Sequence, residues 1–278
     1  MSDLTKRVAS ASVALVILAS VLYVGGLLFK IFLFAVLLLG THELHRAFSN
    51  KFPKHCVYAS LSFVSIWFWT VYLAERAPTE KRYFVLMVGL SLLLSLILAS
   101  MFLSLAKDKE NIKGLMADLL AVFYIAIPVS MFMVLSDFDI LYLILIIAFS
   151  SDSFALFTGK AIGKRKLAPS MSPNKTVEGS IGAVLGTVLA LLIAKHIHYS
   201  YLSYLEVILL GLFGSIFAQL GDLTASLLKR YCEIKDFGKI MPGHGGILDR
   251  LDSIVFVTPL VFLLHMVRLM PDIASMLR

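Results

Sequence analysis

The sequence predicts an all-α polytopic membrane protein with about nine transmembrane helices and a cytoplasmic N-terminus. Of the 278 residues, 59% are hydrophobic and only 15% are charged, and the mean hydropathy is +0.89. A soluble domain carries roughly 25% charged residues. Because a transmembrane helix needs about 20 mostly apolar residues, nine helices would occupy most of the chain. This composition excludes a soluble enzyme, which would need a polar surface.

Nine apolar stretches are the predicted spans. They cover residues 8–24, 27–44, 56–74, 83–105, 115–135, 139–159, 177–195, 205–228 and 250–270. The basic and apolar start resembles a signal peptide, but a second apolar stretch follows at once, so we expect a first span instead. Gly25 and Gly26 favour a tight turn, which would make the first two spans a helical hairpin. We divide the chain into N-terminal membrane helices (1–136, about five spans) and a catalytic membrane region (137–278, about four spans).

The basic residues predict the orientation, because Lys and Arg gather in cytoplasmic loops. With a cytoplasmic N-terminus, 18 of the 25 basic residues fall in cytoplasmic segments and seven on the other side. This arrangement places the C-terminus outside. The two richest loops are 160–176 and 229–249, with five basic residues each when Arg250 is counted with the second. We therefore expect both loops to face the cytoplasm.

Polar residues recur at helical spacing in the eighth predicted span. Gln219, Asp222, Ser226 and Lys229 are three or four residues apart, so they lie on one side of a helix, and Arg230 follows them. An ionisable side chain well inside a span costs about 2.5–3.5 kcal/mol on insertion scales, so it should face protein, water or an ion. The stripe is therefore either part of a functional site or a set of helix–helix hydrogen bonds.

A glycine-rich segment precedes the ninth span. Its core consists of Gly243, His244, Gly245 and Gly246, and Lys235 and Asp236 stand before it. Glycines allow backbone N–H groups to approach an anionic ligand closely. Asp249 and Asp252 follow, three residues apart. The alternative is an ordinary loop, because aspartate also favours the beginning of a helix.

A second candidate anion site follows the sixth span, which itself carries Asp152 among serines. The polar residues of the loop include Lys164, Lys166, Ser172, Lys175 and Thr176. The last two stand where the seventh span begins, and the N-terminus of a helix beside a lysine attracts anions. The alternative is a solvated loop that is basic only because it faces the cytoplasm.

Two familiar motifs are absent. A phosphate-binding P-loop that ends near residue 176 would need glycine where the chain has Pro169 and Asn174. The run from His42 to His45 is not a zinc-protease motif, because position 46 is Arg46. We expect His42 and His45 to be interfacial polar residues at the end of a helix.

The second loop resembles the signature of the phosphatidate cytidylyltransferases, also called CDP-diacylglycerol synthases. The matching residues are Ser226, Lys229, Arg230, Lys235, Asp236, Gly238, Pro242, Gly243, His244, Gly245, Gly246, Asp249, Arg250 and Asp252. Ser151, Asp152, Gly159 and the run Ser172–Gly179 match the family's second conserved region, whereas Leu156 replaces an expected tyrosine. The resemblance is strong over residues 150–253 and is limited to hydropathy over the first 136.

This resemblance implies the reaction of CTP with phosphatidate to give CDP-diacylglycerol and pyrophosphate, in a helical homodimer among membrane lipids. It implies dependence on Mg²⁺, with K⁺ as a candidate second ion, and it gives no reason to expect a nucleic-acid partner. Asp222 and Asp249 match the family's metal-binding aspartates, and Asp152 and Asp252 are further candidate ligands.

Both substrates are polyanions, so the reaction needs metal ions and basic groups that reduce their repulsion and stabilise charge on the transferring phosphorus. The expected catalytic residues are Asp222, Asp249, Lys229, Arg230 and His244. The expected contacts to substrate phosphates are Lys164, Lys166, Ser172, Lys175, Thr176, Lys235, Asp236, Gly243, Gly245, Gly246 and Arg250. A phosphate monoester has its second pKa near 6, so no strong general base is required. We accordingly expect His244 to contact a phosphate.

Two other functions use similar residues. A CTP-dependent kinase for a polyprenol or another lipid would need the same metal and cations, but its products would be a phospholipid and CDP. An ion-coupled transporter could use Asp152 and Asp222 as an ion path, and it would show inverted repeats or broken helices. The sequence shows no such symmetry. A phosphatidyltransferase that consumes CDP-diacylglycerol would carry an aspartate-rich motif that is absent.

Overall fold

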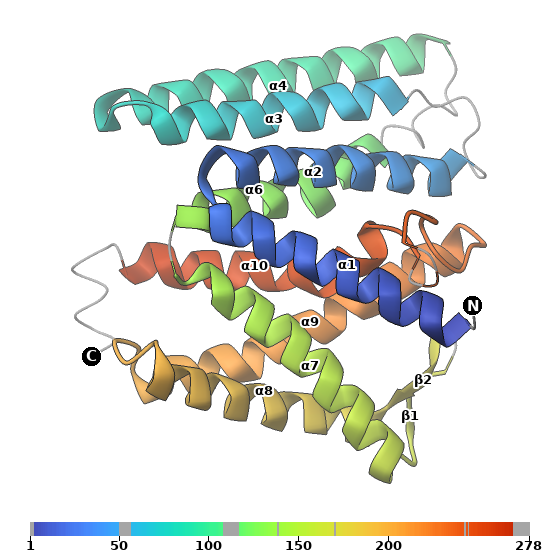
Figure 1. Cartoon of the computed structure of the whole chain (residues 1–278). Coiled ribbons are helices and arrows are strands. Elements are labelled where there is room, and N and C mark those ends of the chain that lie inside the picture. Colours follow the sequence, from blue (N-terminus) through green and yellow to red (C-terminus); the bar gives the residue numbers. More distant parts are fainter. Residues whose placement is uncertain are drawn as a thin grey trace. The chain divides into compact units, whose positions relative to one another are not determined.

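The structure, a computed structural model, describes residues 3–49, 57–107, 117–137, 139–169, 171–241, 243 and 245–268. Most of these residues are helical, and two short strands form one small sheet (Figure 1). The chain forms two compact units. The first comprises Met1–Asp137 and Cys232–Asp249, and the second comprises Phe138–Tyr231 and Arg250–Arg278.

The first unit is built from helices with apolar faces. They are α1 (Asp3–Val24), α2 (Gly26–Ser49), α3 (Val57–Arg76), α4 (Thr79–Lys107), the π-helical turn η2 (Ala121–Ala126), α6 (Ile127–Val134) and the 3₁₀ turn η3 (Leu135–Asp137). The predicted tight turn is present, because Gly25 and Gly26 have φ values of 62° and 53°. Phe29, Phe68 and Ile125 are fully buried and form part of the core.

A buried polar contact joins α2 to its neighbours in this unit. His45 Nε2 lies 2.6 Å from Ser60 Oγ, and the Ser60 hydroxyl donates to Asp118. His45 is 5% exposed, and its position at a membrane interface stays a prediction. His42 is exposed. The difference arises because His45 points toward α3, and a single sequence does not show which side of α2 packs there.

The second unit consists of long helices and a short hairpin. Its elements are α7 (Leu141–Ile162), β1 (Lys166–Ala168), β2 (Ser172–Thr176), α8 (Val177–Ile197), α9 (Tyr204–Tyr231) and most of α10 (Leu248–Arg268). Strands β1 and β2 are antiparallel, with Lys166 opposite Thr176. Glycines allow the helices to approach closely: Gly211 packs against Val188, and Gly221 packs against the backbone of Asp252. Small residues serve this purpose in membrane helices generally.

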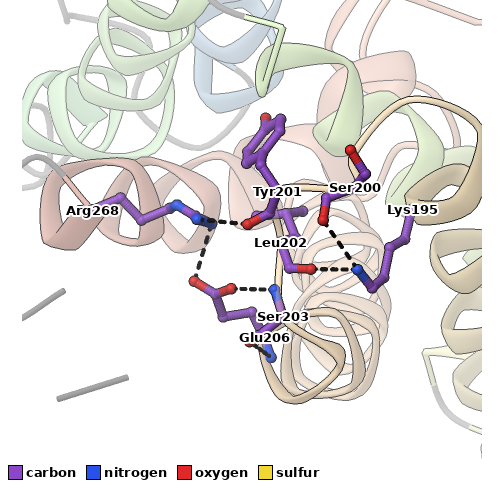
Figure 2. Close-up of polar contacts among 7 residues, drawn as sticks. All are labelled: Lys195, Ser200, Tyr201, Leu202, Ser203, Glu206 and Arg268. Carbon is purple, nitrogen blue, oxygen red and sulfur yellow. Dashed lines mark hydrogen bonds and ion pairs between the residues drawn. The ribbon is translucent and has the colours of Figure 1, made fainter. Parts of the chain in front are cut away.

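A polar network closes the connection between α8 and α9 (Figure 2). Ser203 and Glu206 form a capping box: the Ser203 N–H donates to Glu206 Oε2 over 2.6 Å, and the Glu206 N–H donates to Ser203 Oγ over 3.2 Å. Arg268, the last residue of α10, donates to Glu206 Oε1 over 3.1 Å and to the Tyr201 carbonyl over 3.0 Å. This arginine ties the end of α10 to the beginning of α9.

Side chains at the end of α8 and just after it satisfy backbone carbonyls of neighbouring loops. Lys195 Nζ donates to the carbonyls of Leu202 (2.5 Å) and Ser200 (3.3 Å) (Figure 2). The Tyr199 hydroxyl donates to the Asp139 carbonyl over 2.9 Å. Burial raises the pKa of the Tyr199 phenol, so it stays protonated and keeps this hydrogen bond at neutral pH.

The membrane prediction is supported by the helices. Among the described residues, six helical segments are long and apolar enough to cross a membrane: Gly26–Ser49, Ala117–Val134, Leu141–Ile162, Val177–Ile197, Tyr204–Tyr231 and Leu248–Arg268. Each of the nine predicted stretches overlaps a helix. The chain is therefore an all-α protein with the helices of an integral membrane protein. The count of nine spans, the cytoplasmic N-terminus and the division of roles at residue 136 stay predictions.

Candidate active site

Hydrogen bonds at the N-terminus of α8 hold the backbone of the predicted basic loop of the second unit. The Glu178 carboxylate accepts hydrogen bonds from the backbone N–H groups of Lys164 (2.9 Å) and Arg165 (3.2 Å). Thr176 caps the helix, because its hydroxyl accepts from the N–H of Gly179 over 3.1 Å. The backbone is thus held in place while the side chains of Lys164 and its neighbours are exposed to solvent, where they can meet an anion.

Lys175 and Asp222, which the sequence assigns to different roles, form an ion pair. Lys175 is the penultimate residue of β2, Asp222 lies on α9, and Lys175 Nζ is 2.5 Å from Asp222 Oδ2. The side chains are 23% and 32% exposed, and Nζ itself is shielded from solvent. Lys175 is therefore not part of a freely solvated loop.

The polar stripe on α9 divides between two roles. Gln219 makes helix–helix hydrogen bonds, because its Nε2 donates to the Ser180 carbonyl over 3.3 Å and its Oε1 accepts from the Ser180 hydroxyl over 2.5 Å. Ser215, one turn earlier, lies 3.0 Å from the Ser151 hydroxyl on α7. The alternative weighed for the stripe thus applies to Gln219, whereas Asp222 faces a lysine.

Three carboxylates gather in the second unit from three different helices. Asp152 on α7, Asp222 on α9 and Asp252 on α10 lie near enough for their negative charges to act on one another. We call them the aspartate cluster. The Ser253 hydroxyl donates to Asp152 over 3.5 Å. Nearby cations would stabilise such a concentration of negative charge among apolar helices.

Basic side chains supply part of that positive charge. Lys175 and Arg250 act electrostatically on Asp152, and Lys229 acts on Asp252. Each of these basic residues was predicted from the sequence as a site residue. The fold therefore brings together predicted residues that are separated by up to a hundred positions, which is the property expected of a binding site for polyanions and cations.

The glycine-rich segment belongs to the first unit and folds around Asp249. Asp249 Oδ2 accepts hydrogen bonds from the N–H groups of Phe237 and Gly246, both over 2.9 Å. Gly245 has a φ of 87°, and a Cβ there would approach Asp249 Oδ2 to 2.7 Å, so glycine is required. Gly243 also has a positive φ, 78°. His244 lies outside the described residues.

The segment also binds a second carboxylate, from another helix, which the sequence did not predict. Glu43 of α2 is 3% exposed, and its oxygens accept from the N–H groups of Ile247 (3.1 Å) and Leu248 (2.9 Å). The signal that could have found it is an acidic residue inside an apolar stretch, which is a candidate functional position by default.

Several predicted residues are in solvent. Lys166, Arg230, Lys235, Asp236 and Arg250 are exposed, whereas Ser172 and Lys229 are half-buried. Exposed basic groups can attract anions from solution before they bind. Their individual contacts with substrate stay predictions.

Comparison with known proteins agrees with this chemistry. The model of the cytidylyltransferase family matches residues 5–268. A phosphatidate cytidylyltransferase of Bacillus subtilis is 31% identical, with 95% of this chain and 98% of that protein covered. Proteins of the same name from Staphylococcus epidermidis and Staphylococcus aureus are 31% and 33% identical, with 93% of this chain and 97% of each relative covered. This chain belongs to the cytidylyltransferase family.

Proposed function

We propose that this protein catalyses the reaction of CTP with phosphatidate to give CDP-diacylglycerol and pyrophosphate. The observation that carries the proposal is the similarity, over 95% of the chain, to a Bacillus subtilis protein named phosphatidate cytidylyltransferase. The comparisons give no support to a lipid kinase or to a transporter.

In the proposed step, a phosphate oxygen of phosphatidate attacks the α-phosphorus of CTP. A new P–O–P bond forms, the bond from the α-phosphorus to the oxygen that bridges to the β-phosphorus breaks, and that oxygen leaves with pyrophosphate. The attacking phosphate is largely ionised at neutral pH, so no protein base is needed. The task of the side chains is to place two polyanions together and to stabilise charge at the phosphorus.

We assign that task to the cations around the aspartate cluster. Lys175 balances Asp222 before substrates arrive and contacts a phosphate when they are bound. Lys229 and Arg250 contribute further positive charge, since they already act on the cluster. The exposed Lys164 and Lys166 attract the triphosphate from solution.

The residues fit a divalent cation. Mg²⁺ prefers carboxylate oxygens and usually keeps several waters, with one or two carboxylates and the substrate phosphates completing its shell. Within the described residues no group of three His, Cys, Asp or Glu side chains is arranged to hold a metal ion. We propose Asp222 and Asp249 as ligands, with Asp152 and Asp252 as further candidates and K⁺ as a second ion. Bound Mg²⁺ would neutralise phosphate charge.

We also propose a nine-span topology with the site on the cytoplasmic side, and a homodimer. The distribution of basic residues supports the orientation, because 18 of 25 fall on one side. Cytosolic CTP would then reach the basic loop directly. The dimer rests on the family resemblance alone.

Purified protein in detergent, incubated with CTP, phosphatidate and Mg²⁺, should form CDP-diacylglycerol and pyrophosphate in equal amounts. EDTA should stop the reaction, and added Mg²⁺ should restore it. Mass spectrometry of the lipid and an enzymatic assay for pyrophosphate measure the two products. Formation of CDP and a newly phosphorylated lipid would show a kinase instead, and folded protein with no CDP-lipid under any divalent metal would refute the proposal.

A further inference from the structure

Glu43 is far along the sequence from the motifs that resemble the family, but in the folded protein it contacts one of them. It belongs to α2, whereas the motifs that resemble the family lie in residues 150–253. Both of its carboxylate oxygens are used: Oε1 accepts from Ile247 and Oε2 from Leu248, over 3.1 and 2.9 Å. These two N–H groups stand at the beginning of α10, where helical N–H groups have no partner within the helix.

The glycine-rich segment is shaped to admit this carboxylate. A side chain at Gly238 or at Gly246 would overlap with the Glu43 carboxylate. Glycine at these two positions is therefore explained by the space that Glu43 occupies, not by a turn, since neither has a positive φ. Glu43 itself is 3% exposed, so backbone N–H groups of the segment take the place of water around its carboxyl group.

Asp249 is held by the same segment from the other side. The N–H of Gly246 donates to Asp249, and the next two N–H groups along the chain donate to Glu43. Three consecutive backbone donors are thus shared between the two carboxylates. Any shift of residues 246–248 away from Glu43 also moves the group that orients Asp249.

We propose that Glu43 is a positioning residue of the active site, which fixes the glycine-rich segment and thereby the Asp249 carboxylate. The effect on catalysis rests on the proposed function, whereas the effect on the segment does not. Groups that orient a metal ligand typically change metal affinity or activity by about 10- to 100-fold when removed. Glu43→Gln should therefore raise the Mg²⁺ concentration for half-maximal activity by about 10-fold or more.

The matched control is Glu75→Gln. Glu75 is an acidic residue of the same unit, and it pairs with Lys30 over 2.9 Å. Glu75→Gln should lower thermal stability but leave the Mg²⁺ requirement and the KM for CTP unchanged. Glu43→Asp, which keeps the charge but is shorter, should fall between wild type and Glu43→Gln.

Hydrogen–deuterium exchange of the substrate-free protein in detergent tests the positioning separately from catalysis. The amides of Ile247 and Leu248 should exchange about tenfold faster in Glu43→Gln than in the wild type. Their exchange rates in Glu75→Gln should equal those of the wild type. If Glu43→Gln does not fold, Gly238→Ala displaces the carboxylate instead and should give the same exchange.

Unchanged exchange at both amides would overturn the proposal, whether or not the wild type makes CDP-diacylglycerol. So would equal changes in Mg²⁺ requirement for the two glutamine variants, because that result would show a general loss of structure. A wild type that makes no CDP-lipid but shows faster exchange in Glu43→Gln would leave the positioning intact and remove only the proposed reaction.

Discussion

Carboxylates within apolar helices are the most informative single residues of this chain. Asp152, Asp222 and Asp252 come from three helices and act on one another, and Lys175 pairs with Asp222 over 2.5 Å. The sequence identified each of these residues from its spacing or from the family resemblance. It could not identify the pair, because Lys175 and Asp222 are on different elements and one sequence carries no long-range contacts.

Lys175→Ala should reduce kcat/KM for CTP by about 10- to 150-fold, because a charge-assisted contact contributes about 1.5–3 kcal/mol. Lys175→Arg should lose less, since it keeps the charge. The control is Lys160→Ala, an exposed residue in the last turn of α7, which should retain normal kinetics. Initial rates of CDP-lipid formation at varied CTP measure the effect.

The ion pair adds a second test of the same residue. If Lys175 and Asp222 act together, the loss in the double variant with Asp222→Asn should be smaller than the product of the two single losses, because residues in contact are not additive. Losses that multiply would mean that the contact seen between them has no part in catalysis. Normal kinetics of Lys175→Ala would mean that this lysine has no role in binding substrate.

The packing of the helices positions the aspartate cluster, and glycine residues allow two of these helices to approach closely. A methyl group at Gly221 would overlap with the carbonyl oxygen of Asp252, so α9 and α10 touch through their backbones beside two members of the aspartate cluster. The helices themselves were predictable from hydropathy. The strands β1 and β2 were not, because a five-residue strand with the polar sequence of Ser172–Thr176 has no apolar alternation.

Gly221→Ala should lower both thermal stability and activity, because overpacking typically costs about 1–3 kcal/mol and separates the carboxylates. Gly40→Ala is the matched control: a Cβ there would meet only side-chain atoms at 3.8–4.0 Å. Alanine is up to about 1 kcal/mol better than glycine within a helix, so this control should be neutral or stabilising. Thermal unfolding followed by tryptophan fluorescence in detergent, with the CDP-lipid assay, distinguishes the two outcomes. Equal behaviour of the variants would contradict the role of close packing at Gly221.

At the scale of the whole molecule, the sequence predicts the class of fold better than it predicts which segments belong together. Hydropathy locates the helices, but it does not show that Cys232–Asp249 belongs to the same compact unit as the first 137 residues. The contact between Glu43 and Ile247 spans 204 positions. Local patterns carry no information about such contacts, so a carboxylate of α2 that serves the glycine-rich segment became visible only in three dimensions.

The second unit allows the proposed orientation to be tested on one helix. At about 1.5 Å per residue, the 21 residues of α8 span about 31 Å, close to the roughly 30 Å of a bilayer core. Arg165 and Ser200, both exposed, stand beyond its two ends. In a variant that lacks Cys56 and Cys232, cysteine at position 165 or at Lys239 should therefore react with a membrane-impermeant maleimide only in inside-out vesicles. Cysteine at position 200 should react only in intact cells.

The opposite labelling at both ends would reverse the topology and deny cytosolic CTP a direct route to the basic loop. Labelling of positions 165 and 200 from the same side would mean that α8 does not cross the bilayer. The position-200 variant also serves as the control for label access, because it must react from the side on which the others are silent. The proposed orientation depends on the basic residues, which are concentrated around the loops that carry Lys175 and Asp249. The same positive charge therefore lies where the polyanionic substrates are proposed to bind.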